Sequence, residues 1–87
     1  MEFEYDHNKS LSNLKKHGID FEESIALWED QNALVLKSKH VGEIRFLTIG
    51  IIKDKHWSAI STIRGNKIRI ISVRRSRIKE IQLYENY

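Results

Sequence analysis

The chain has 87 residues, which suits one domain, and we expect residues 1–87 to fold as a single unit. It contains no cysteine, which excludes a disulfide framework, thiolate metal ligands and cysteine nucleophiles. The first residues are acidic rather than basic, and no apolar run approaches the roughly 20 residues of a membrane span. We therefore expect a cytoplasmic protein without a signal peptide.

Charge is distributed unevenly along the chain. Residues 1–43 contain nine acidic and five basic residues (net −4), and residues 44–87 contain three and ten (net +7), which together give the overall +3. Seven basic residues without an intervening acid lie close together: Arg64, Lys67, Arg69, Arg74, Arg75, Arg77 and Lys79. Five of the seven are arginine, whose planar guanidinium matches phosphate geometry. This asymmetry predicts a surface that binds a polyanion.

The N-terminal part predicts a strand followed by two helices. Residues 3–5 alternate in polarity and predict a short edge strand. Asp6 is a suitable N-cap for a helix that ends at Gly18, with Leu11 and Leu14 at the spacing of a buried stripe.

The second predicted helix begins with a capping-box pattern, in which Glu23 follows the N-cap Asp20 by three positions. Its apolar face consists of Phe21, Ile25 and Trp28. Turn-forming residues at 29–32 end the helix.

From residue 33 onward the period is that of strands. The predicted strands cover residues 33–36, 45–52, 56–63 and 67–73, with turns at 41–43, 53–55 and 65–66. The chain is expected to leave the sheet at residues 74–77, and Ser76 to cap a last helix with Ile78, Ile81 and Tyr84 on one face. The order β-α-α-β-β-β-β-α predicts an α+β fold.

Two stretches of the sequence resemble the BrnT family of type II toxins, which is similar to RelE and ParE. Residues 13–24 read N-L-K-K-H-G-I-D-F-E-E-S, and residues 62–75 read T-I-R-G-N-K-I-R-I-I-S-V-R-R, followed by Glu80 and residues 84–85. The resemblance covers nearly the whole chain and is weakest between residues 32 and 55.

This resemblance implies a RelE-like fold: an N-terminal short strand and two helices, then an antiparallel sheet of about four strands and a C-terminal helix. It also implies an endoribonuclease that blocks translation and is neutralised by a ribbon-helix-helix antitoxin of the BrnA type. We expect the protein to need no cofactor. Some family members carry an acid just before the arginine of the R-G pair and an aromatic residue two positions earlier. Here these positions hold Ile63 and Ser61. Either another group is the general base, or this copy is weak or inactive.

Metal-independent RNA cleavage needs a cation at the phosphate and a group that transfers protons near neutral pH. Arg64 is our first candidate for stabilising the charge on the phosphate, because it lies at the end of a strand just before a Gly-Asn turn. Arg74 and Arg75 are further candidates, but as neighbours on a strand they point to opposite faces. The candidates for RNA binding are Lys67, Arg69, Arg77 and Lys79. Of these, Arg69 suits a structural or partner-facing role somewhat better.

His56 is a candidate for proton transfer, and it shares a strand face with Arg64. However, eight residues of strand separate the two by roughly 26 Å. Tyr84 is an alternative acid–base group by analogy with RelE, although it also suits a core position. His17 suits a helix end, His7 and His40 have no supporting context, and no histidine pair has metal-ligand spacing. Trp28 and Trp57 suit core packing better than base stacking.

Two other functions are compatible with the sequence. One is a binding module for RNA or the antitoxin that has lost its chemistry, and the other is a ParE-like poison of DNA gyrase. The chain has no DNA-reading motif, so we expect contact with operator DNA only through the antitoxin.

Overall fold

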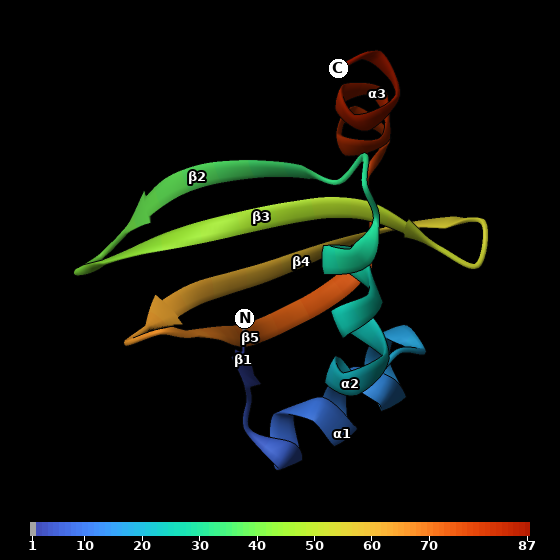
Figure 1. Cartoon of the computed structure of the whole chain (residues 1–87). Coiled ribbons are helices and arrows are strands. Elements are labelled where there is room, and N and C mark those ends of the chain that lie inside the picture. The colour runs from blue at the N-terminus through green and yellow to red at the C-terminus, as the bar shows by residue number, and fades with distance from the viewer. Residues whose placement is uncertain (1) are drawn as a thin grey trace.

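A computed structural model describes residues 2–87 of the chain. Its elements, in chain order, are β1 (Glu2–Glu4), α1 (His7–His17), α2 (Phe21–Ser24), the 3-10 helix η1 (Ile25–Glu29), β2 (Leu34–His40), β3 (Glu43–Ile52), β4 (Lys55–Arg64), β5 (Lys67–Arg75) and α3 (Ile78–Asn86). The predicted α+β order is confirmed (Figure 1). Within residues 2–87, no helix is long and apolar enough to cross a membrane.

The strands form one sheet in the order β1-β5-β4-β3-β2. The four long strands pair antiparallel, as predicted, and β1 adds a fifth strand that pairs parallel to β5 at the edge. All four long strands extend beyond their predicted bounds, most of all β2, which reaches His40, and β5, which continues through Arg74 to Arg75. The chain therefore leaves the sheet only after Arg75, because Trp57 and Ser58 of β4 still pair with these arginines.

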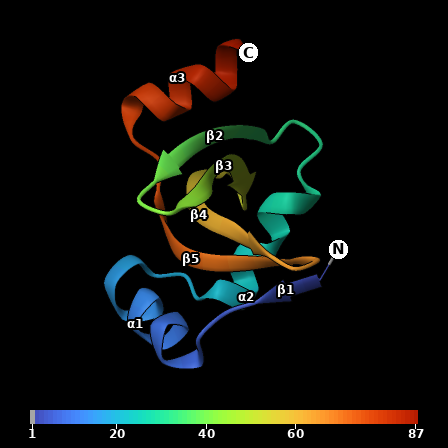
Figure 2. The same ribbon diagram turned by 90° about the vertical axis from the view of Figure 1, so that its left-hand side faces the viewer.

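One face of the sheet packs on α2 and η1 and forms the main core. Buried Phe21 and Leu27 from these helices lie against apolar side chains of the adjacent strands β4 and β5. These strand residues are Trp57, Ala59, Ile70 and Val73. α1 lies beside β5, and α3 lies at the other side of the sheet, near β2 and β3 (Figures 1 and 2).

The predicted buried stripe of α1 is wrong. Leu11 is 63% exposed and Leu14 42% exposed, whereas the buried residues of this helix are Ser10 and Asn13. The caps are as predicted: Asp6 accepts hydrogen bonds from two backbone amides of the first turn, and Gly18 is left-handed at φ 80°. α1 packs through small polar side chains because it lies against the edge of β5. The backbone amide and carbonyl groups at that edge need hydrogen-bond partners, and Asn13 supplies them.

The second helix is shorter than predicted. The capping box of Asp20 and Glu23 is present, but the α-helix has four residues and continues as a 3-10 helix. Phe21 is buried, and Ile25 and Trp28 are partly buried against the core, so the predicted apolar face is confirmed.

α3 begins at a different residue from the one predicted. Arg77 is the N-cap, while the Ser76 hydroxyl lies 2.8 Å from the Ser58 hydroxyl. Ile78 is 74% exposed, so it does not share the half-buried face of Ile81 and Tyr84. No residue of α3 is fully buried, and polar contacts therefore have a large part in holding this helix.

Candidate functional site

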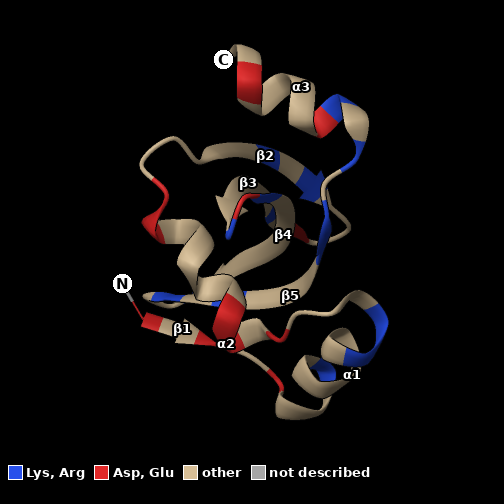
Figure 3. Cartoon of the chain, turned by 90° about the vertical axis from the view of Figure 1, so that its right-hand side faces the viewer, with Lys and Arg blue, Asp and Glu red and all other residues tan. Residues whose placement is uncertain are grey.

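Basic side chains collect on the sheet face opposite α2 and η1, which we call the basic face. In an antiparallel sheet, paired residues point to the same side. Arg45 pairs with Thr62, Thr62 with Arg69, Ser58 with Arg74, and Arg64 with Lys67. Strand residues alternate between faces, except at the irregular β4–β5 pairing next to Ile60 and Ser61, which brings Arg74 to the face of Arg69. One face therefore carries Arg45, Arg64, Lys67, Arg69 and Arg74, and the strand residues of the core cluster lie on the other. Figure 3 shows basic residues on the strands and acidic residues on α2 and β1.

Three of these five cations have an acidic partner. Arg69 binds Glu4 at 3.0 Å, Arg74 binds Glu80 at 2.8 Å, and Arg45 binds Glu43 at 2.8 Å. Within residues 2–87, Arg64 and Lys67 have no ion-pair partner. These two cations, on the β4–β5 hairpin, are the ones most ready to bind an external anion.

Arg74 fixes the start of α3 to the sheet. Its guanidinium donates to both carboxylate oxygens of Glu80 at 2.8 Å, and the same carboxylate accepts from the Ser58 hydroxyl and the Arg77 backbone amide. Pairing with Arg74, together with the bonds from Arg77 and Ser58, lowers the pKa of Glu80 to about 2. The carboxylate in turn raises the pKa of Arg74.

His56 and Tyr84 meet at the same end of the sheet. His56 Nε2 lies 2.7 Å from Glu85 Oε2, and its ring packs edge-on against Tyr84 with centroids 5.4 Å apart. The Tyr84 hydroxyl donates to Asp30 Oδ2 at 2.7 Å. Burial and the Asp30 carboxylate raise the pKa of Tyr84 to about 12, so the hydroxyl is protonated at neutral pH.

Arg75 points to the other face of the sheet, as the alternation of adjacent residues predicts. Its guanidinium carbon lies 5.5 Å from the ring centroid of Trp57, and its Nε donates to the His56 carbonyl at 3.3 Å. Trp57 is 8% exposed, which confirms the prediction that it packs in the core.

The structure divides the predicted catalytic residues between the two ends of the sheet. His56, Arg74, Arg75 and Tyr84 lie near α3, whereas Arg64 ends β4 at the opposite hairpin. His56 and Arg64 are eight residues apart on one strand, roughly 26 Å. A single phosphate therefore cannot contact both groups.

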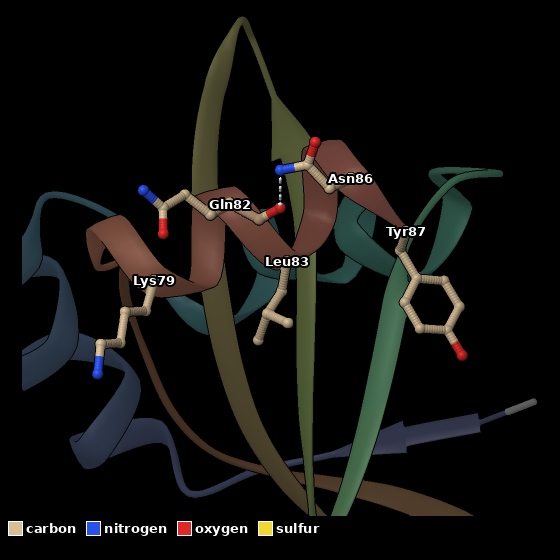
Figure 4. Close-up of a pocket in the computed structure, with 5 residues that line it drawn as sticks. All are labelled: Lys79, Gln82, Leu83, Asn86 and Tyr87. Carbon is tan, nitrogen blue, oxygen red and sulfur yellow. Dashed lines mark hydrogen bonds between the residues drawn. The ribbon is translucent and has the colours of Figure 1, made fainter.

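The predicted RNA-binding residues are divided as well. Lys67 and Arg69 lie on the basic face, and Arg69 also joins β5 to β1 through Glu4. Arg77 and Lys79 lie at the start of α3. Lys79 lines an open hollow of about 480 Å³ with Gln82, Leu83, Asn86 and Tyr87 (Figure 4).

Three polar residues lie near the β2–β3 hairpin: His40, for which the sequence gives no supporting context, and Glu43 and Arg45, which no sequence motif singles out. Arg45 and His40 help to line a hollow of about 360 Å³ on the basic face, together with Ser38, Phe46, Leu47, Ile60 and Arg74. The sequence signal that could have identified these residues is Gly42, which lies in a two-residue hairpin turn. Such a turn fixes the register of its flanking strands and therefore places the side chains beside it.

The described part of the chain, residues 2–87, holds no group of three or more histidine, aspartate or glutamate side chains that could bind a metal ion.

The fold and site thus define a small α+β protein with one basic sheet face and a C-terminal helix at its end. The sequence model of one family, described as the ribonuclease toxin BrnT of type II toxin–antitoxin systems, matches residues 5–80, and the chain belongs to this family. The resemblance seen in the two sequence signatures is confirmed. A search of curated proteins found no match.

Proposed function

We propose that residues 1–87 form one RelE-like toxin domain that cleaves RNA without a metal ion and inhibits translation in the cytoplasm. The observation that carries the proposal is the gathering of Arg45, Arg64, Lys67, Arg69 and Arg74 on one sheet face. A row of fixed cations is the arrangement that holds an RNA backbone and stabilises charge developing on a phosphate.

In this proposal Arg64 stabilises the phosphorane. It is exposed, lies beside Lys67 across the hairpin, and has no ion-pair partner within residues 2–87. An arginine without a partner can bind a phosphate without first breaking an existing ion pair, and its donors match the phosphate oxygens.

His56, Arg74 and Tyr84 form a second proposed site at the α3 end, and Arg75 lies at the same end on the other face of the sheet. Each already has a protein contact, so RNA would reach them only by exchanging one of these contacts. We propose that this end binds nucleotides of the RNA that lie beyond the phosphate held by Arg64. Arg77 and Lys79 lie nearby on α3.

A type II toxin family implies an antitoxin partner. We propose a BrnA-like ribbon-helix-helix antitoxin that presents acidic and apolar residues to the basic face. Operator DNA would be contacted only by the antitoxin. Repression of the operator by this chain alone would contradict that assignment.

The test is induced expression of the wild type, Arg64→Ala and Lys16→Ala, with growth and total RNA followed in parallel. Lys16 is an exposed cation on α1 and serves as the matched control. We expect growth arrest with RNA loss for the wild type and Lys16→Ala, and relief for Arg64→Ala. Purified wild type should also cut RNA in EDTA.

Other outcomes identify the alternatives. Normal growth and intact RNA with abundant folded wild type would mean a binding module without chemistry. Arrest with DNA damage and intact RNA would mean a gyrase poison.

A further inference from the structure

We propose that His40 is the proton-transfer residue of this site, acting beside Arg45 and Arg64 at the end of the basic face that carries the β2–β3 hairpin. The inference rests on the proposed ribonuclease function and names its active centre.

The hairpin turn fixes the positions of His40 and Arg45. Val41 and Gly42 form the turn, and Gly42 has φ +77°, a conformation that favours glycine. His40 pairs with Glu43 across the turn, and Ser38 pairs with Arg45. Because positions 38 and 40 lie two apart on a strand, as do 43 and 45, all four side chains lie on the same face.

Arg64 reaches the same end of the sheet from the second hairpin. Arg45 pairs with Thr62, two residues before Arg64 on the same face of β4. The charges of Arg45, Arg64 and His40 all lower the pKa of Glu43, with the Arg45 hydrogen bond as the main cause. The strand register supports this placement, because Glu43 pairs with His40 on β2 and lies two residues from Arg45, as Arg64 lies two residues from the partner of Arg45 on β4.

The hollow beside His40 has the size and the mixed lining that part of a nucleotide needs. Its volume is about 360 Å³, and its lining combines apolar Leu47 and Ile60 with Arg45 and Arg74. Pockets of roughly 300 Å³ and above bind small ligands. The apolar part suits a ribose or base, and the arginines suit the flanking phosphates.

His40 is also the histidine best placed for this work. It is exposed and lines the hollow, whereas His56 binds Glu85, and His7 and His17 lie at the two ends of α1, beside the β5 edge. The charged groups around His40 on the basic face are Glu43, Arg45, Arg64 and Arg74. An imidazole ring can both accept and donate a proton, as general acid–base catalysis requires.

In the proposed step, neutral His40 removes the proton of a ribose 2′-hydroxyl. The 2′-oxygen forms a bond to the adjacent phosphorus, and the bond from phosphorus to the 5′-oxygen breaks. Water protonates the leaving 5′-oxygen, and the proton on His40 then neutralises the resulting hydroxide. The products are a 2′,3′-cyclic phosphate and a 5′-hydroxyl, and Arg45 and Arg64 stabilise the charge on the phosphorane.

The experiment compares purified wild type, His40→Gln and His7→Gln on a fluorescent single-stranded RNA in EDTA, both alone and on translating ribosomes. Binding is measured in parallel with the 2′-deoxy analogue, which cannot be cleaved by this route. We expect His40→Gln to lose roughly 100-fold or more in cleavage rate. It should bind the analogue within about threefold of wild type, whereas His7→Gln should match wild type in both.

The pH profile separates chemistry from a structural role. A base loses function when protonated, so the wild-type rate should fall at acid pH, and the residual rate of His40→Gln should lack this acid limb. A folded His40→Gln that cleaves within threefold of wild type overturns the assignment of His40 and leaves the ribonuclease proposal standing. A wild type that cuts neither naked nor ribosome-bound RNA overturns both.

Discussion

Asn13 on α1 and Val73 on β5, 60 residues apart in sequence, are joined by two hydrogen bonds. Asn13 Nδ2 donates to the Val73 carbonyl at 2.9 Å, and Asn13 Oδ1 accepts from the Val73 amide at 3.2 Å. The same Nδ2 also donates to the Ile19 carbonyl at 2.8 Å. Since β1 covers only residues 67–69 of β5, this amide replaces the missing strand at the edge.

We predict that Asn13→Ala destabilises the fold by about 3 kcal/mol, because it leaves buried backbone groups without partners. Thermal unfolding should shift down by roughly 12 °C or more for a domain of this size. Leu11→Ala is the control, since Leu11 is 63% exposed and should cost less than about 0.5 kcal/mol. Equal losses for the two variants would contradict the edge-capping role of Asn13.

Replacing Glu80 should loosen α3. Glu80→Gln removes the charge that binds Arg74 at 2.8 Å, with the two side chains only 12% and 22% exposed. We expect a loss of about 2 kcal/mol in urea unfolding. Glu22→Gln, an exposed position on α2, should leave the unfolding midpoint unchanged. Unfolding curves that coincide for the two variants would rule out the role of this ion pair.

The ion pair between Glu80 and Arg74 should also make the free energy of unfolding depend on pH in the acid range. The pKa of Glu80 is about 2 in the folded protein and 4.5 in a free side chain. The unfolded chain therefore binds the proton first, so the stabilisation is complete above about pH 4.5 and is lost as the pH falls towards 2. We expect stability to fall less steeply over this range in Glu80→Gln than in wild type, as measured by urea unfolding at several pH values.

The sequence predicts those elements whose determinants are local. The caps of Asp6, Asp20 and Gly18, and the turn at residues 65–66, follow from backbone conformations and side-chain hydrogen bonds within a few residues. The prediction that Leu11 and Leu14 are buried was wrong, because periodicity identifies the apolar side of a helix but not the element on which the helix packs. Here that element is a strand edge, which requires polar groups.

The candidate site depends on strand register, which the sequence alone defines poorly. The basic run from Arg64 onward predicted an anion-binding surface, but alternation alone could not say which cations share a face after the irregular pairing near Ile60 and Ser61. His40 lacked context because β2 was predicted to end at residue 36, four residues before it. The ion pairs of Arg69 and Arg74 involve β1 and α3, which only the tertiary fold brings close.

Tyr84→Phe should destabilise the fold by about 1.5 kcal/mol, because the Tyr84 hydroxyl donates to a carboxylate at 2.7 Å. Burial alone would raise the pKa of Asp30, but bonds from Tyr84 and from the Asn32 and Ile51 amides lower it overall. Tyr87→Phe is the matched control at a residue that is 92% exposed. Equal thermal midpoints for both variants would show that the Asp30 contact adds nothing to stability.

RNA affinity should depend on salt through the unpaired cations of the basic face. Each phosphate contact to a single strand contributes about 0.7 to the slope of log affinity against log salt. Arg64→Ala and Lys67→Ala should therefore each reduce the slope by about that amount, measured by fluorescence anisotropy with the 2′-deoxy analogue. Arg69→Ala should change it less, because Arg69 already binds Glu4 at 3.0 Å, and Lys16→Ala on α1 should not change it. Equal slopes for wild type, Arg64→Ala and Lys67→Ala would place the RNA on another surface.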